Sequence, residues 1–267
     1  MIATQDPVGA SYDALAPAYD LLTGGHDHAA WAAEIEGLAL RAGLRGRRLL
    51  DAGCGTGSLI GPMLARGYDA TGVDLSPGML AVAREKLGPE VALHHADMRD
   101  LPALGAFDLI WSLGDAVNYL VTDDELVAAL AGLVRNLAPG GVVAFDVVTL
   151  STFRALASSL FVTPADDRVV VYEGRADATL PAGAVAEAWI DRLERTGAHA
   201  WERIRTVHRQ RHLPRPVLER ALGAAGLRAV AVWGTDGAGG LDRPLDEDRH
   251  AKAVYIAQRV APTGEGR

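Results

Sequence analysis

The sequence predicts an α/β fold with a doubly wound, mostly parallel sheet that is interrupted by antiparallel strands. Short apolar strand patterns alternate with helical patterns between residues 47 and 148, which is typical of a parallel sheet covered by helices. After Leu150 the apolar residues recur in steps of two, as they do in antiparallel strands. The alternation of helix and strand resumes at about Arg215. We therefore expect one α/β core with an inserted β-meander.

The predicted elements follow this division along the chain. Helical spacing predicts two N-terminal helices, from Ser11 to about Leu22 and from about Asp27 to Leu44. Seven core strands are predicted at residues 47–53, 68–74, 91–95, 107–113, 140–148, 226–234 and 250–260. Core helices are predicted at residues 58–66, 77–87, 123–137 and 215–225, and meander strands at 168–175, 184–194 and 200–212. The predicted parts are an N-terminal helical part (1–45), the core (46–150), the meander (151–212) and a return to the core (213–267).

Composition is that of a globular protein and argues against several function classes. Hydrophobic residues make up 49% of the 267 residues, which excludes a disordered or fibrous chain. The formal net charge of −8 argues against a dedicated nucleic-acid binder, which carries a basic stripe. The single cysteine, Cys54, cannot form an internal disulfide. Because no apolar run approaches the roughly 18 residues of a membrane span, and no signal peptide is evident, we expect a cytoplasmic protein without membrane or nucleic-acid partners.

A glycine-rich turn follows the first predicted core strand. The segment LLDAGCGTGS, residues 49–58, places Gly53, Gly55 and Gly57 where the strand must turn sharply into a helix. Glycine allows a positive φ angle there, and its missing side chain lets a ligand approach the backbone. A strand–helix turn that binds nothing can have the same pattern, so the loop alone is a weak signal.

The second core strand ends in a carboxylate that strengthens the ligand interpretation. In a Rossmann-like sheet a carboxylate at this position, here Asp74, accepts hydrogen bonds from both hydroxyls of a bound ribose. The same carboxylate disfavours a 2′-phosphate and therefore NADP. Two cofactor classes carry a suitable ribose, nicotinamide dinucleotides and S-adenosylmethionine (SAM).

The spacing of the glycines distinguishes these two cofactors. A dinucleotide-binding loop reads G-x-G-x-x-G and seats a pyrophosphate at the helix N-terminus, whereas this loop reads G-x-G-x-G. Asp51 precedes the loop and suits the cationic sulfonium and ammonium groups of SAM, which has no phosphate. We therefore predict SAM as the cofactor. An NAD-dependent oxidoreductase and a SAM-binding protein without catalysis remain as alternatives.

Four segments together resemble the ordered motifs of class I SAM-dependent methyltransferases. They are LLDAGCGTG, GVDLSPGML, the acid in HHADMRDLP, and NLAPGGVVAFDV, in this order between about residues 47 and 150. The resemblance implies that Asp97 accepts a hydrogen bond from the adenine amino group and that Met98 flanks the ring. It also implies a Rossmann-like seven-stranded sheet. The predicted cofactor-binding residues are Tyr12, Tyr19, Asp51, Gly53, Cys54, Gly55, Asp74, Leu75, Met79, Asp97, Met98, Leu113, Gly114 and Asn118.

Two further segments narrow the resemblance. YDALAPAYDLLTGGHDHAAW (12–31) and WSLGDAVNYL (111–120) are similar to small bacterial methyltransferases with a β-meander after the fifth strand, including amino-sugar N,N-dimethyltransferases. In that group the N-terminal helices close over SAM, which implies that residues 1–45 form a lid and that its tyrosines line the cofactor cavity. The macrolide-type sugar enzymes carry a tyrosine where this chain has about Thr23, so the acceptor stays open.

Methyl transfer from a sulfonium requires an aligned nucleophile and, for a hydroxyl acceptor, a base. On the last meander strand, Ile204, Thr206, His208 and Gln210 lie on one face and Arg203, Arg205, Arg209 and Arg211 on the other. If the first face turns toward the active site, His208 is the preferred base, and Tyr119 and His28 are the other candidates. We expect the arginines to face solvent or a second copy in a homodimer, or to hold a phosphate-bearing acceptor.

The resulting prediction is methyl transfer to an amine, or else a hydroxyl, of a small molecule, as in natural-product biosynthesis. No metal is expected, because Asp115 and Asp146 form no recognisable ligand set.

Overall fold

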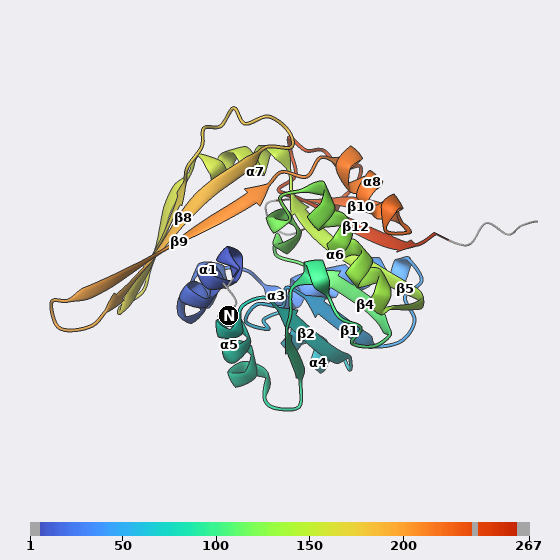
Figure 1. Cartoon of the computed structure of the whole chain (residues 1–267), viewed down its shortest axis with the longest axis horizontal. Coiled ribbons are helices and arrows are strands. Elements are labelled where there is room, and N and C mark those ends of the chain that lie inside the picture. Colours follow the sequence, from blue (N-terminus) through green and yellow to red (C-terminus); the bar gives the residue numbers. More distant parts are fainter. Residues whose placement is uncertain (1–5, 237–239, 261–267) are drawn as a thin grey trace, which may run out of the picture.

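Two β-sheets organise the computed structural model, which describes residues 6–236 and 240–260 (Figure 1). The large sheet has the strand order β11-β10-β12-β5-β4-β1-β2-β3. Its strands are β1 (Arg48–Ala52), β2 (Asp69–Asp74), β3 (Ala92–His95), β4 (Phe107–Ser112), β5 (Leu137–Val148), β10 (Leu227–Thr235), β11 (Leu241–Asp242) and β12 (Lys252–Arg259). The first five run parallel, and the last three join antiparallel beyond β5. The predicted doubly wound, mostly parallel sheet is confirmed.

Helices cover both faces of this sheet because successive strand residues point to opposite sides. Leu49 and Leu50 of β1 are both fully buried, and they belong to separate hydrophobic cores. The core around Leu49 includes residues of α3 (His28–Arg41), α4 (Ile60–Ala65) and α5 (Pro77–Leu87). The core around Leu50 includes residues of α6 (Asp123–Asn136) and α8 (Arg215–Ala224). In the described part of the chain no helix is long and apolar enough to cross a membrane.

The inserted meander is the second sheet and is fully antiparallel. Its strands are β6 (Leu160–Pro164), β7 (Arg168–Gly174), β8 (Val185–Arg195) and β9 (Trp201–Arg211), in that spatial order. The register places His208 opposite Ala188 and Thr206 opposite Ile190. Thr206 and His208 are buried, so this face of β9 turns inward as predicted.

Residues 6–23 of the predicted N-terminal lid lie between the two sheets. Its helix α1 (Pro7–Leu15) packs beside β9 on one side and α5 on the other (Figure 1). Leu15 and Ala18 share a small hydrophobic cluster with Val170 and Ile190 of the meander. The hydroxyl of Ser11 donates a hydrogen bond to the carbonyl of Val207 at 3.0 Å. The lid therefore joins the meander to the core.

The lid differs from the single predicted helix over residues 11–22. It begins earlier, at Pro7, because the Asp6 carboxylate caps α1 by accepting from the N–H of Val8 at 2.8 Å. It is also broken into α1, the 3₁₀-helix η1 (Ala16–Ala18) and α2 (Tyr19–Thr23). Pro17 lies at the break, where it removes a backbone donor and disfavours a continuous α-helix.

Two other parts of the fold were missed. A helix α7 (Leu150–Ala157) and the strand β6 precede the three predicted meander strands, so the meander has four strands. The short strand β11 pairs with the end of β10, which gives the large sheet eight strands where the sequence predicted seven. Thr149 caps α7 by accepting from the N–H of Thr152, a contact that is clear only once the strand before it is placed.

Asn118 fastens the meander to the core. This fully buried residue lies in the 3₁₀-helix η3 (Ala116–Tyr119), and its Nδ2 donates to the carbonyl of Arg211 at 2.8 Å. Its Oδ1 accepts from the N–H of Val148 at 3.2 Å. The side chain predicted to bind the cofactor is thus occupied by contacts to β9 and β5.

We predict that Asn118→Ala lowers the free energy of unfolding by about 1–3 kcal/mol, because two backbone groups lose their partner. Urea unfolding checks this value. Calorimetric titration should give a SAM affinity within about twofold of the wild type. A variant of unchanged stability that binds SAM poorly would restore Asn118 as a cofactor ligand.

Candidate active site

The candidate active site is a cavity at the carboxyl end of the parallel strands, where the strand order reverses between β1 and β4. Open α/β sheets bind ligands at this place. The cavity has a volume of about 120 Å³. The predicted site residues that line it are Tyr12, Tyr19, Gly53, Gly55, Asp74, Leu75, Met79, Asp97, Met98, Leu113, Gly114 and Tyr119.

The glycine loop has the backbone conformation that the sequence predicts. Gly53, Gly55 and Gly57 have positive φ angles of 84°, 53° and 76°. The N–H of Gly53 donates to the carbonyl of Val73 at 2.8 Å, which holds the loop against β2. A Cβ atom at Gly53 would lie 3.0 Å from the Cβ of Ala116, another residue of the cavity wall. The loop therefore brings its backbone close to the cavity.

Asp74 lies at the tip of β2 and is held by two backbone amides. Its Oδ2 accepts from the N–H of Gly55 at 2.8 Å, and its Oδ1 accepts from the N–H of Ser76 at 2.9 Å. Burial raises the pKa of Asp74, while these two hydrogen bonds oppose that rise. Each oxygen keeps a lone pair, so the carboxylate can still accept from a ligand in the cavity.

Asp51 is fully buried near the end of β1. Burial raises its pKa to about 7, and the neighbouring Trp111 side chain opposes that rise. Its Oδ2 atom has no hydrogen-bond donor among the residues that the structure describes. Asp51 does not line the cavity, but Gly53, two residues along the loop, does. A cationic ligand group at the loop would favour the ionised form of Asp51.

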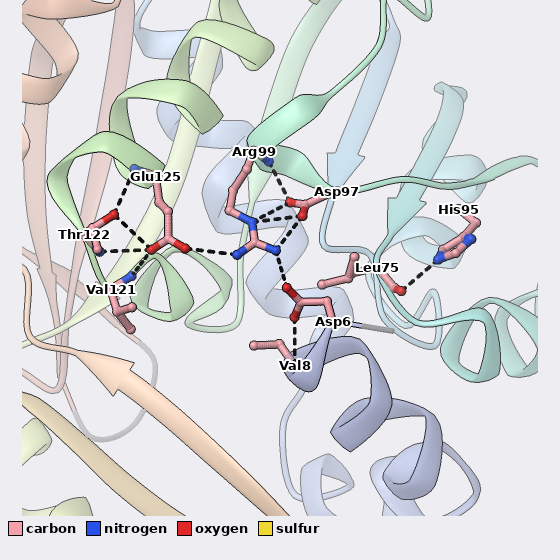
Figure 2. Close-up of polar contacts among 9 residues, drawn as sticks. All are labelled: Asp6, Val8, Leu75, His95, Asp97, Arg99, Val121, Thr122 and Glu125. Atoms are coloured by element: carbon pink, nitrogen blue, oxygen red, sulfur yellow. Dashed lines mark hydrogen bonds and ion pairs between the residues drawn. The ribbon is translucent and has the colours of Figure 1, made fainter. Parts of the chain in front are cut away.

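Asp97 lines the cavity but is already bound by an arginine (Figure 2). The Nε of Arg99 lies 3.0 and 2.9 Å from the two carboxylate oxygens, and its Nη2 lies 2.6 Å from Oδ2. The backbone N–H of Arg99 also donates to Oδ1 at 2.8 Å. An adenine amino group would therefore share Asp97 with Arg99, which also lines the cavity and which sequence reasoning missed.

Arg99 connects three separate parts of the chain. Besides Asp97 it binds Asp6 at the start of the lid and Glu125 in the first turn of α6, the latter at 3.0 Å (Figure 2). Glu125 in turn accepts from the N–H of Thr122 at 3.0 Å. Hydrogen bonds to the three carboxylates raise the pKa of Arg99 and fix its cationic form. The sequence spacing of Asp97 and Arg99 suggests only the first of these contacts.

Three tyrosines form another wall of the cavity. Tyr12 and Tyr19 come from the lid and Tyr119 from η3. The ring centroids of Tyr12 and Tyr19 lie 5.9 Å apart, edge to face. The Tyr12 hydroxyl donates to the Tyr119 hydroxyl at 2.8 Å. Burial raises the pKa of all three phenols, to about 12 in Tyr19, so they are neutral at physiological pH.

His208 turns inward as predicted but does not line the cavity. Its Nδ1 lies 2.9 Å from the Tyr119 hydroxyl, and its Nε2 lies 2.9 Å from the Thr206 hydroxyl. Burial lowers its pKa to about 4, so the ring is neutral at pH 7. His208 is thus linked to the cavity through the hydroxyl of Tyr119, and its role as a base stays a prediction.

Two other predicted residues lie away from the cavity wall. His28 begins α3, partly exposed, with its ring centroid 6.3 Å from that of His26. Cys54 is buried in the core around Leu49, and burial raises the pKa of its thiol. Neither of them, nor Asn118, is brought to the cavity.

A partly buried ion cluster lies next to the cavity residue Gly114. Asp115 has a left-handed φ of 64°, and its N–H donates to Asp146 Oδ1 at 2.8 Å. Lys252 Nζ lies 2.7 Å from Asp115 Oδ1 and 3.3 Å from Asp146 Oδ2. One lysine is therefore shared by two acids. Within residues 6–236 and 240–260 no group of three or more potential ligands could hold a metal ion.

Arg203, Arg205 and Arg209 of β9 are exposed, whereas Arg211 binds Asp123 of α6 at 2.7 Å. Arg203 and Arg205 both bind Asp191 on the neighbouring strand, with Arg205 Nε 2.8 Å from Oδ1. The guanidinium of Arg205 also lies 4.1 Å from the ring centroid of Trp189. Arg203 and Arg205 are therefore already paired with a carboxylate, which leaves them less available to bind the phosphate of an acceptor.

Known proteins resemble this chain in sequence and in structure. A family model described as a methyltransferase domain matches residues 49–141. The dTDP-3-amino-3,4,6-trideoxy-alpha-D-glucopyranose N,N-dimethyltransferase of Streptomyces venezuelae is 39% identical over 133 residues, 49% of this chain and 56% of the relative. The chain thus spans about half the length of the curated relatives it matches.

Solved structures extend the likeness to nearly the whole chain. A SAM-dependent methyltransferase from Clostridium acetobutylicum superimposes with a TM-score of 0.77 at 23% identity, over 94% of this chain and 99% of that one. The sugar N-methyltransferase KedS8 from Streptoalloteichus gives a TM-score of 0.69 at 27% identity, over 89% and 92%. Residues 49–141 of this chain therefore match a methyltransferase domain, and the chain has the Rossmann-like fold of the SAM-dependent methyltransferase structures.

Proposed function

We propose that this protein transfers the methyl group of SAM to the amine of a small molecule. The observation that carries the proposal is the cavity, in which the glycine loop and Asp74 face a wall of three tyrosines. The cofactor would lie against the loop, and the acceptor would approach from the tyrosine side. The match to a methyltransferase domain favours SAM over a nicotinamide dinucleotide.

The residues at the loop fit SAM. Asp74 keeps lone pairs for the two ribose hydroxyls while the amides of Gly55 and Ser76 hold it in place. The unpartnered Oδ2 of buried Asp51 suits the positive charge of the methionine part. When bound, SAM supplies a methyl group activated by its sulfonium. The chain's own contribution is to orient both reactants and to exclude water.

An amine acceptor suits the cavity better than a hydroxyl acceptor. A hydroxyl must lose its proton to a base, whereas a neutral amine attacks through its lone pair. Among the described residues no histidine lines the cavity. The tyrosines that line it have raised pKa values and act only through hydrogen bonds. This set of residues can hold an amine without having to deprotonate it.

Amino sugars are the acceptor class to test first. The Streptomyces relative is named as an N,N-dimethyltransferase of an amino sugar nucleotide, and the Streptoalloteichus structure as a sugar N-methyltransferase. This chain has Thr23 near the place where the macrolide-type enzymes have a tyrosine, so its acceptor would differ in detail. Incubation with labelled SAM and a panel of amino sugars, other small amines and phenols tests the proposal. Methylation of phenols alone would overturn the amine assignment.

We predict that Asp74→Ala weakens SAM binding at least about tenfold, because hydrogen bonds to a charged acceptor are lost and ~1.4 kcal/mol is a factor of ten. Calorimetric titration measures the affinity. Asp69→Ala is the matched control, since Asp69 is an exposed carboxylate at the opposite end of the same strand. Equal affinity in both variants would show that the ribose lies elsewhere.

We also predict that the ratio of the SAM affinity of the wild type to that of Asp51→Asn falls about tenfold from pH 8 to pH 6. A carboxylate with a pKa of about 7 is mostly protonated at pH 6, and a cationic ligand must displace that proton. The amide variant has no carboxyl proton to displace, and any titration of SAM itself affects both proteins. A constant affinity ratio across this pH range would contradict the role of Asp51.

A further inference from the structure

We propose that Thr206 and His208 are positioning residues that fix the direction of a hydrogen-bond chain ending at Tyr12. The chain runs from Tyr12 through Tyr119 to His208 and Thr206. In this direction each residue from Tyr12 to His208 donates a hydrogen bond to its neighbour on the Thr206 side. The Tyr12 oxygen is then left to accept a hydrogen bond in the cavity, and the N–H of the amine to be methylated would donate it. This inference rests on the proposed methyl transfer to an amine.

The Thr206 hydroxyl sets the direction because it has a single hydrogen. Its Oγ1 lies 3.0 Å from the carbonyl oxygen of Ile190, which can only accept, so the hydroxyl donates there. The same Oγ1 lies 2.9 Å from Nε2 of His208 and must accept from it. His208 therefore carries its proton on Nε2. The opposite direction would leave the Ile190 carbonyl without this donor and would form one hydrogen bond fewer.

The remaining bonds follow from this tautomer. A neutral imidazole has one N–H, so Nδ1 of His208 accepts a hydrogen bond from the Tyr119 hydroxyl at 2.9 Å. Burial keeps the ring neutral, since it lowers the pKa of His208 to about 4. With its hydrogen used, Tyr119 accepts from the Tyr12 hydroxyl at 2.8 Å. Tyr12 then has only lone pairs to offer to a ligand.

The hydrogen bonds from Tyr12 to Thr206 join three segments that are distant in the sequence. Tyr12 lies on α1 of the lid, Tyr119 on η3 of the core, and His208 with Thr206 on β9 of the meander. The rings also pack edge to face, with centroids 5.2 Å apart for Tyr12 and His208 and 5.5 Å apart for Tyr12 and Tyr119. The Tyr12 oxygen is thus held by packing as well as by hydrogen bonds.

An accepting oxygen is useful for amine methylation. When the amine nitrogen forms its bond to the methyl carbon, the carbon–sulfur bond breaks and positive charge develops on the nitrogen. An N–H donated to Tyr12 strengthens as that charge grows, whereas the lone pair of the nitrogen stays free to attack. The interaction is therefore stronger in the transition state than in the bound substrate, and its loss should lower kcat more than it raises KM.

The tautomer can be measured without any acceptor. In protein labelled with ¹⁵N-histidine, we expect His208 to show the Nε2–H tautomer at neutral pH, both free and with SAM added. Thr206→Val should change this tautomer or mix the two forms, and Thr206→Ser should restore it. A wild-type Nδ1–H tautomer, or an imidazolium at pH 7, would overturn the assigned direction.

Kinetics test the consequence. Thr206→Val should lower kcat about tenfold or more, with KM and SAM affinity within about twofold, and Thr206→Ser should recover most of the rate. Tyr12→Phe should show the same loss, and the double variant no further loss, because both act through one hydrogen bond to the amine. Val207→Ala, on the outer face of the same strand, is the control and should be fully active.

Each adverse outcome has a distinct meaning. A wild-type kcat for folded Thr206→Val would show that the chain does not orient the acceptor. A loss of SAM affinity in Thr206→Val or Tyr12→Phe would assign the Tyr12 oxygen to the cofactor and overturn the inference. If the wild-type protein methylates no amine, the proposed function fails, while the tautomer measurement still reports on the direction of the chain.

Discussion

The hydrogen bond from the N–H of Gly55 to the carboxylate of Asp74 joins the loop after β1 to the tip of β2. This contact and the bond from Gly53 to Val73 hold the glycine loop, with its positive φ angles, against the neighbouring strand. Ser76 continues the connection, since it donates to Asp74 and begins α5. The cavity therefore depends on a carboxylate that is buried and yet retains two free directions for a ligand.

The lid is attached to the same place. Asp13 of α1 accepts from the N–H of Gly78 at 2.7 Å and from the hydroxyl of Ser76, so a lid carboxylate caps the first turn of α5. At the other side of the cavity Arg99 binds Asp6, the residue that caps α1 itself. Both ends of α1 are thus tied to loops that follow strands of the parallel sheet. These contacts hold α1 at the edge of the cavity.

The sequence predicted those features that arise from local pattern. The alternation of strands and helices, the glycine loop and the inward face of β9 depend on spacing, and the structure has them all. The sequence pattern could not predict that Arg99 binds Asp6, because these residues are 93 positions apart in the chain. The spacing of β9 placed His208 on the inward face. It could not show that the Tyr119 hydroxyl lies 2.9 Å from the His208 ring, because these residues are 89 positions apart in the chain.

The break of the lid at Pro17 has a consequence for the shape of the tyrosine wall. In an unbroken α-helix, residues seven apart are separated by about 10.5 Å along the axis, two turns apart. Here the helix stops after Leu15 and restarts at Tyr19, and the ring centroids of Tyr12 and Tyr19 lie 5.9 Å apart. The break at Pro17 thus brings the Tyr12 and Tyr19 rings together at one side of the cavity. We expect related sequences without a proline at this position to have a cavity of different width between the same two tyrosines.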